Sequence, residues 1–311
     1  MAAEPTIALL NGAREAQETR AAALRATVSD YWALTKPDVN FLILITTFAG
    51  FYLASSREPA RFHYLLALHA LLGTLLVAGG TATLNQALEA SFDSQMRRTA
   101  RRPVAAGRIK TSHAFGFGVS LSVAGAAYLA FAVNGLACLL AVVTLATYLF
   151  LYTPLKRVTP LCTLVGAFPG AMPPLIGWAA ARGRLDPEAW VLYAIVFLWQ
   201  FPHFMAITWM YREDYARAGY LVLPLNEKRD RYVVWQSLAA SLVLIAVTLV
   251  PTIRGKMGPI YFAGALVLGT MFAFYSARPV FQRSNVSARR LLLASIVYLP
   301  AIFILMMLDA K

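Results

Sequence analysis

The sequence predicts an all-α, polytopic membrane protein with about nine transmembrane helices. Of its 311 residues, 59% are hydrophobic and only 14% are charged, which is too apolar for a soluble domain. Its apolar runs are also long enough to cross a hydrocarbon core of about 30 Å. The predicted spans are Asp38–Ser55, Tyr64–Leu88, His113–Val133, Leu136–Tyr152, Thr159–Ala180, Ala189–Tyr211, Val233–Pro251, Pro259–Ala277 and Arg290–Leu308.

The Lys and Arg residues predict the orientation of these spans. With nine spans, 21 of these residues lie on the side that holds the N-terminus and seven lie on the opposite side. Because cytoplasmic loops carry an excess of Lys and Arg, we expect the N-terminus in the cytoplasm. The net charge of +13 then reflects topology and attraction to anionic membrane lipid. No soluble nucleic-acid module separates the spans, so we expect no nucleic-acid partner.

The chain divides into a short tail and one membrane domain. Residues 1–30 are Ala-rich and polar, without the apolar core and cleavage site of a secretory signal peptide. We expect a flexible cytoplasmic tail or a short surface helix there, followed by a transmembrane domain over residues 31–311. Cys138 and Cys162 fall inside predicted spans, where packing is a more common role than a disulfide or a metal pair.

A polar run closes the second span. Asn85, Glu89 and Asp93 are spaced by four residues, so on a helix they share one face about 12 Å long. The basic segment Met96–Arg108 follows directly. Oxygen ligands beside cations favour a site for Mg²⁺ and a phosphate ester. The alternative is a solvated helix end, which has the same composition.

A second polar cluster follows the sixth span, four helices later and on the same predicted side of the membrane. It reads Tyr211-Arg-Glu-Asp-Tyr215. Matching positions suggest that the two loops face each other across a pocket, although the sequence contains no clear repeat. Glu213 and Asp214 are otherwise ordinary solvated acids of a loop.

The fifth span is predicted to be broken. It contains three prolines and three glycines, namely Pro169, Pro173, Pro174, Gly166, Gly170 and Gly177. Each proline removes a backbone donor, and a helix broken at membrane depth is tolerated where it is buried or lines a cavity. We therefore expect this helix to line a substrate chamber. A kink that serves packing alone is the other explanation.

The sixth span contains an ionisable residue among aromatic side chains. His203 lies within Trp199-Gln-Phe-Pro-His-Phe-Met205. Polar side chains inside a membrane are costly and usually face an interior cavity. His203 and Asp214 are eleven residues apart, close to three helical turns, and share a face if the helix continues.

The segments Asn85–Pro103, Lys156–Trp178 and Trp199–Gly219 together resemble the protohaem IX farnesyltransferases, or haem O synthases, among the UbiA-type intramembrane prenyltransferases. The resemblance extends from about Tyr31 to the C-terminus. It implies nine helices around a central cavity in a bacterial inner membrane, Mg²⁺ as cofactor, farnesyl diphosphate as prenyl donor and haem b as acceptor. A haem A synthase or oxidase assembly factors are the implied protein partners.

The resemblance also implies roles for individual residues. Asn85, Glu89 and Asp93 are expected to hold Mg²⁺, and the expected catalytic set adds His203 and Asp214. Diphosphate is negatively charged, so the expected substrate contacts are mostly cationic. They are Arg97, Arg98, Arg101, Arg102, Lys156, Tyr211, Arg212, Tyr215 and Arg217.

One departure from the wider family concerns the second loop. Many UbiA-type enzymes have D-x-x-x-D where this chain has Tyr211-x-x-x-Tyr215, which puts a second Mg²⁺ in doubt. Either Glu213 or Asp214 replaces the missing acids, or Arg212 and Arg217 hold the diphosphate directly.

The expected reaction adds a farnesyl cation to a vinyl carbon of haem, after which water traps the new cation. Four aromatic residues are expected to stabilise the cation from one wall, and His203 to ligate or orient the haem iron. The wall consists of Trp199, Phe201, Trp209 and Tyr211. Two rivals remain, a transporter with broken helices and a prenyltransferase acting on a quinone precursor or a chlorophyll-like acceptor.

Overall fold

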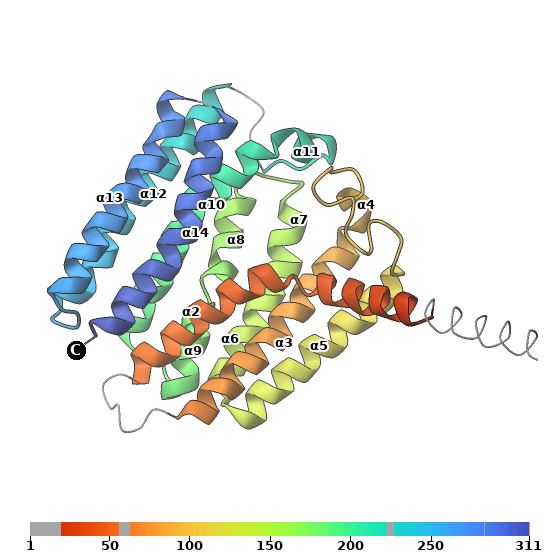
Figure 1. The fold of residues 1–311 in the computed structure, drawn as a ribbon, viewed down its shortest axis with the longest axis horizontal. Helices are drawn as coiled ribbons and strands as arrows, with labels where there is room; N and C mark the ends of the chain where they lie inside the picture. Colours follow the sequence, from red (N-terminus) through yellow and green to blue (C-terminus); the bar gives the residue numbers. More distant parts are fainter. Residues whose placement is uncertain (1–19, 56–62, 223–226, 283, 311) are drawn as a thin grey trace, which may run out of the picture.

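The computed structural model describes residues 20–55, 63–222, 227–282 and 284–310 (Figure 1). Within these ranges, nine helices are long and apolar enough to cross a membrane, which confirms the predicted fold class and number of spans. Residues 1–19 of the expected tail lie outside the described ranges, and residues 20–34 are helical. Cys138 and Cys162 are free thiols in the described part of the chain.

The helices end within a few residues of most predicted bounds. Several spans consist of more than one helical segment, and one segment, η2, is a π-helix. The elements are α2 (Pro37–Ser55), α3 (Tyr64–Leu88), α4 (Ala90–Asp93), α5 (Thr111–Ala132), α6 (Gly135–Ala146), η2 (Thr147–Tyr152), α7 (Thr153–Leu155), α8 (Cys162–Gly170), α9 (Pro173–Arg182), α10 (Pro187–Met210), α11 (Arg212–Arg217), α12 (Glu227–Ile253), α13 (Pro259–Phe281) and α14 (Asn285–Leu308).

The helices form two groups joined along α2. On one side α3 packs on α5, and on the other α10, α12, α13 and α14 pack together (Figure 1). α2 contacts α9, α3 and α14, and therefore connects the two groups. α4 and α11 lie near each other at one end of the bundle, far from the C-terminus (Figure 1). We call this end the loop end.

The break in the fifth span is confirmed. α8 ends at Gly170 and α9 begins at Pro173, so the helix of this span is interrupted at Ala171 and Met172. The glycines allow close approach there. A Cβ atom at Gly170 would overlap the side-chain oxygen of Gln200, and one at Gly177 would overlap the backbone oxygen of Thr47. Small residues at such contacts allow membrane helices to pack backbone against backbone.

Gly177→Ala should destabilise the protein by about 1–3 kcal/mol, the usual cost of overpacking, because its methyl group meets the rigid backbone of α2. Gly116→Ala, in α5, is the matched control: an added Cβ there meets no atom within 4 Å, and alanine favours a helix over glycine. Thermal unfolding of both variants in detergent gives the comparison. A Gly177→Ala variant as stable as Gly116→Ala would contradict this account of the contact between α2 and α9.

Candidate active site

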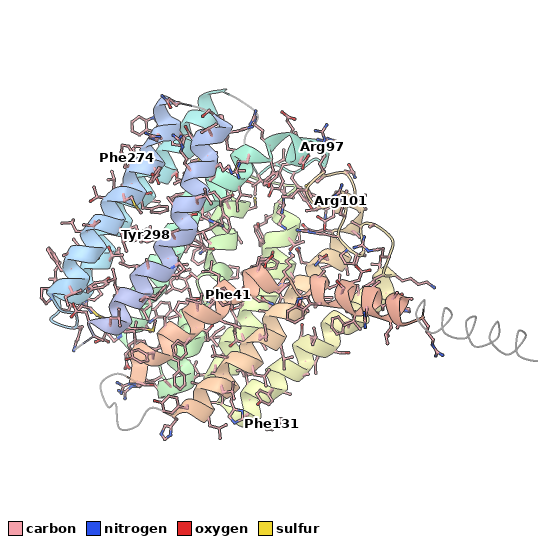
Figure 2. The ribbon with its side chains drawn as sticks, in the orientation of Figure 1. Phe41, Arg97, Arg101, Phe131, Phe274 and Tyr298 are labelled. Carbon is pink, nitrogen blue, oxygen red and sulfur yellow. The ribbon has the colours of Figure 1, made fainter. Side chains whose placement is uncertain are left out.

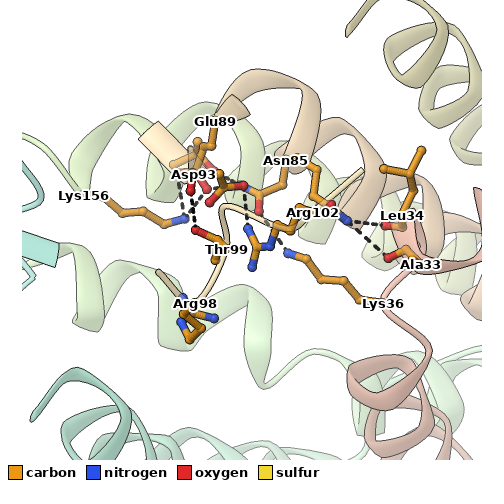
Figure 3. Close-up of polar contacts among 12 residues, drawn as sticks. Ala33, Leu34, Lys36, Asn85, Glu89, Asp93, Arg98, Thr99, Arg102 and Lys156 are labelled. Atoms are coloured by element: carbon orange, nitrogen blue, oxygen red, sulfur yellow. Dashed lines mark hydrogen bonds and ion pairs between the residues drawn. The ribbon is translucent and has the colours of Figure 1, made fainter. Parts of the chain in front are cut away.

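The polar run at the end of the second span gathers in one buried cluster (Figure 3). Asn85, Glu89 and Asp93 are only 2%, 6% and 1% exposed. The prediction of a single continuous helical face is wrong in one respect. α3 ends at Leu88, Glu89 has φ −100° and ψ 7°, and Asp93 belongs to the short α4. This interruption places the three side chains in the interior and excludes the alternative of a solvated helix end.

Glu89 is the centre of this cluster. Its carboxylate accepts from Lys156 Nζ at 2.9 and 3.0 Å, and from the Tyr220 hydroxyl at 2.9 Å. Asn85 Nδ2 donates to the same carboxylate at 2.8 Å. Burial by itself raises the pKa of Glu89, but the Lys156 charge and these donors outweigh it and lower the pKa. Glu89 is therefore ionised at neutral pH.

Asp93 has its own cationic partner. Arg102 Nη1 lies 2.7 Å from Asp93 Oδ2, and the hydroxyl of Thr99 donates to the Asp93 backbone oxygen at 2.9 Å (Figure 3). Both partners belong to the predicted basic segment. The basic segment therefore folds back over the acidic run. Arg102, one of the arginines predicted to bind phosphate, contacts Asp93 in this run.

Lys36 is a member of the cluster that the sequence analysis missed. Its amine donates to Asn85 Oδ1 at 3.1 Å (Figure 3), and its φ of 51° is unusual for a residue other than glycine. Gln86 Nε2 donates to the Leu34 carbonyl at 2.9 Å, which fixes the chain just before Lys36. Burial, and secondly the charges of Arg102 and Lys156, lower the pKa of Lys36 to about 7. A lysine directly before Pro37, at the start of the first span, was the available signal.

Lys156 reaches Glu89 from the end of a π-helical segment, a feature often found at functional sites. It follows η2 and α7. Its amine lies 4.6 Å from the centre of the Tyr152 ring, and its backbone oxygen accepts from Leu221 N at 2.8 Å. Burial opposes the charge of Lys156, but Tyr152 and Glu89 outweigh burial and raise the pKa. Lys156 therefore carries a buried positive charge.

The two polar loops lie together, and the contacts between them are direct. Asp214 is buried and accepts from the Arg98 backbone N–H at 3.1 Å and from Arg217 Nη2 at 3.0 Å. The Arg98 guanidinium lies 5.2 Å from the Tyr211 ring centre and 5.9 Å from that of Tyr215. Both oxygens of Asp214 thus have partners. Asp214 therefore joins the two loops through Oδ2 and holds Arg217 of its own helix through Oδ1.

Three predicted phosphate contacts lie apart from this cluster. Arg212 donates to the Trp209 carbonyl and to Asn285 Oδ1, both at 2.9 Å, and so points toward α14. Arg97 and Arg101 are exposed at the loop end (Figure 2). In this arrangement Asn285, at the start of α14, holds the Arg212 guanidinium, and diphosphate binding by Arg212 stays a prediction.

His203 lies within α10, seven residues before its last residue, Met210. Its ring stacks on Trp199 with 4.7 Å between centres, and its Nδ1 lies 2.8 Å from Ser295 Oγ. The expected common face with Asp214 is absent, since α10 ends before α11 begins and the helix does not continue. Phe201 packs in a separate cluster with Ala167 and Ala240. It therefore does not belong to an aromatic wall with His203.

The cluster fits a magnesium ion that is coordinated partly by protein oxygens and partly by the oxygens of a bound phosphate. Asn85, Glu89 and Asp93 supply hard oxygen donors. No group of three His, Cys, Asp or Glu side chains in the described ranges could hold a metal alone. Mg²⁺ is commonly bound through one or two carboxylates together with substrate phosphates. Three cations, Lys36, Arg102 and Lys156, surround the same oxygens and suit such an anion.

Comparison with known proteins agrees with this geometry. The sequence model of the UbiA prenyltransferase family matches residues 43–303. The chain belongs to the UbiA prenyltransferase family. Among solved UbiA-type structures, one described as digeranylgeranylglyceryl phosphate synthase has a TM-score of 0.74 at 17% identity, covering 91% of this chain and 98% of that one. This similarity establishes the fold.

Curated relatives place the chain within a branch of the UbiA family. A protohaem IX farnesyltransferase of Solibacter usitatus is 47% identical over 286 residues, which cover 90% of this chain and 98% of the relative. One from Koribacter versatilis is 44% identical over 287 residues, covering 90% and 93%. The resemblance to the protohaem IX farnesyltransferases is confirmed, and the chain is a prenyltransferase of this membrane family.

Proposed function

We propose that this enzyme transfers the farnesyl group of farnesyl diphosphate to a vinyl group of haem b, which gives haem O. The observation that carries the proposal is the near full-length similarity to protohaem IX farnesyltransferases, together with a buried cluster of acids and cations suited to a diphosphate. A transporter does not need such a cluster. The test must distinguish haem b from two other acceptors, a quinone precursor and a chlorophyll-like ring.

The buried cluster of acids and cations would bind the diphosphate. Lys36, Arg102 and Lys156 would contact its oxygens, while Asn85, Glu89 and Asp93 would hold Mg²⁺. A related UbiA structure from Archaeoglobus fulgidus is described as bound to DMAPP and Mg²⁺, with a TM-score of 0.64 at 14% identity over 89% of this chain and 98% of that one. Bound here, Mg²⁺ would offset negative charge on the leaving group.

The chain's own cations would assist departure of the diphosphate. When the bond between farnesyl C1 and oxygen breaks, its electron pair stays on the diphosphate, and the nearby ammonium and guanidinium groups stabilise the added charge. The allylic cation then forms a carbon–carbon bond with a haem vinyl group. Water adds to the resulting cation and a proton is lost. Trp199 and His203 would lie beside the haem, which would explain an ionisable residue at this depth.

The protein is a multi-pass integral membrane protein. We further propose that it resides in a bacterial inner membrane with the loop end in the cytoplasm, where most Lys and Arg residues lie. Farnesyl diphosphate is a soluble anion, so a diphosphate site at that end faces its supply. A haem A synthase or oxidase assembly factors would receive the product.

The test is expression of the full chain in cells that lack haem O, followed by mass spectrometry of extracted haems. A haem in which one vinyl group has become a hydroxyethylfarnesyl group is expected, and its amount should depend on added farnesyl diphosphate in isolated membranes. Prenylation of a quinone precursor, with haem b unchanged, would instead establish the alternative acceptor.

Lys36 should make diphosphate binding depend on pH. Its pKa is lowered to about 7, so the free enzyme loses the ammonium charge as the pH rises through 7. Affinity for inorganic pyrophosphate should then fall by up to about tenfold per pH unit above 7. Lys36→Arg stays charged and should show a smaller fall between pH 7 and 8 in calorimetric titrations. Identical pH profiles for the two proteins would contradict a role for Lys36 in anion binding.

A further inference from the structure

Ser295, in α14, contacts the ring of His203 through its hydroxyl group. Ser295 is fully buried. Its Oγ lies 2.6 Å from the Leu292 backbone oxygen and 2.8 Å from His203 Nδ1. A hydroxyl has one hydrogen to donate and can accept through its lone pairs.

The direction of these two hydrogen bonds follows from the partners. A backbone carbonyl oxygen has no hydrogen, so the contact with Leu292 uses the only proton of the Ser295 hydroxyl. With that proton directed to Leu292, the contact with His203 runs the other way, and Nδ1–H donates to Ser295 Oγ. A neutral imidazole that carries its proton on Nδ1 has a free lone pair on Nε2. The two contacts of Ser295 therefore favour the Nδ1–H tautomer of His203.

The same serine residue also fixes the orientation of the ring. Trp199 Nε1 donates to the Ser295 backbone oxygen at 2.8 Å, and the Trp199 ring stacks on His203 with an interplanar angle of 24°. Ser295 on α14 therefore contacts both His203 and Trp199 on α10. His203 is only half-buried, and its Nε2 has no hydrogen-bond partner within the described ranges.

We infer that Ser295 is a positioning residue for the acceptor: it holds His203 in the Nδ1–H tautomer so that Nε2 binds the iron of haem b. The inference rests on the proposed function, because it takes haem b as the acceptor. A histidine that ligates a metal through one ring nitrogen usually donates its other N–H to a fixed acceptor, which sets the tautomer and strengthens the ligand. Ser295 occupies the place of that acceptor.

The experiment is a titration of the purified full-length protein in detergent with haem b, followed by the Soret absorption band. Loss of such an outer partner commonly weakens metal binding about 10- to 100-fold. Ser295→Ala should therefore weaken haem binding by that factor and alter the Soret band. Ser295→Thr keeps a hydroxyl acceptor and should bind more tightly than Ser295→Ala.

Two further variants separate the possible causes. Ser276→Ala is the matched control, because Ser276 is equally buried in α13 and bonds to Ser241 rather than to His203. It should bind haem like the wild-type protein. His203→Gly should lose the band and regain it when free imidazole is added. Affinity for inorganic pyrophosphate should stay unchanged in the Ser295 and His203 variants.

Each outcome has a distinct meaning. If the wild-type protein binds no haem b, the proposed function fails and the inference falls with it. If wild-type protein binds haem b but Ser295→Ala and Ser276→Ala bind it equally well, the positioning role alone is overturned. An equal loss of haem and pyrophosphate binding in Ser295→Ala would assign Ser295 to the fold and likewise overturn it.

Discussion

Asp93→Asn should reduce turnover about 10²- to 10³-fold while leaving the protein folded. Asp93 is 1% exposed, and its Oδ2 lies 2.7 Å from Arg102. Asparagine has nearly the same shape and can still accept a hydrogen bond from Arg102, but it lacks the negative charge. Removing one preorganised charged group from a catalytic site commonly has an effect of this size. Farnesyl transfer to haem b in detergent, at saturating Mg²⁺, measures it.

Asp30→Asn is the control for this variant. Asp30 also pairs with an arginine, Arg108, at 3.0 Å, but outside the buried cluster. It should retain wild-type turnover, and thermal unfolding should show that both variants fold. Asn85→Ala should lower turnover like Asp93→Asn, and Glu89→Asp should retain more activity than Glu89→Ala. Wild-type turnover in folded Asp93→Asn would remove Asp93 from the proposed metal ligands.

The spans and the break in the fifth span could be predicted because their causes are local. Length and apolar composition define a membrane helix, and Pro173 lacks the backbone donor that would continue α8. The grouping of Asn85, Glu89 and Asp93 was also predictable, since a spacing of four residues brings side chains together even where the helix is interrupted after Leu88.

Other members of the site depend on contacts between distant parts of the chain. Lys36 meets Asn85 across 49 residues, and Tyr220 meets Glu89 across 131. The position of Lys36 before Pro37 marks a lysine at the start of a span, but no local pattern shows which residue Lys36 or Tyr220 contacts. The orientation of Arg212 likewise depends on a distant residue. Its position in a polar loop suggested a phosphate contact, but Asn285, 73 residues away, directs its guanidinium to α14.

Lys156→Met should destabilise the protein by about 3–5 kcal/mol as well as lowering turnover. Lys156 pairs with Glu89 at 2.9 Å, and their side chains are 11% and 8% exposed. Methionine has a similar length but leaves the Glu89 carboxylate buried without its cation, and removing one partner of a buried ion pair usually has this cost. Thermal and denaturant unfolding in detergent, together with farnesyl transfer to haem b, give the two quantities.

The double variant Glu89→Gln/Lys156→Met separates stability from catalysis. Without the carboxylate no buried charge is left unpaired, so most of the lost stability should return, since both partners of a buried pair can often be replaced at little cost. Turnover should stay low, because the site has lost a metal ligand and a phosphate-binding cation. A double variant that recovers both stability and turnover would show that the pair supports only the fold. A single Lys156→Met variant with full stability would show that Tyr220 and Asn85 are sufficient to hold the Glu89 charge.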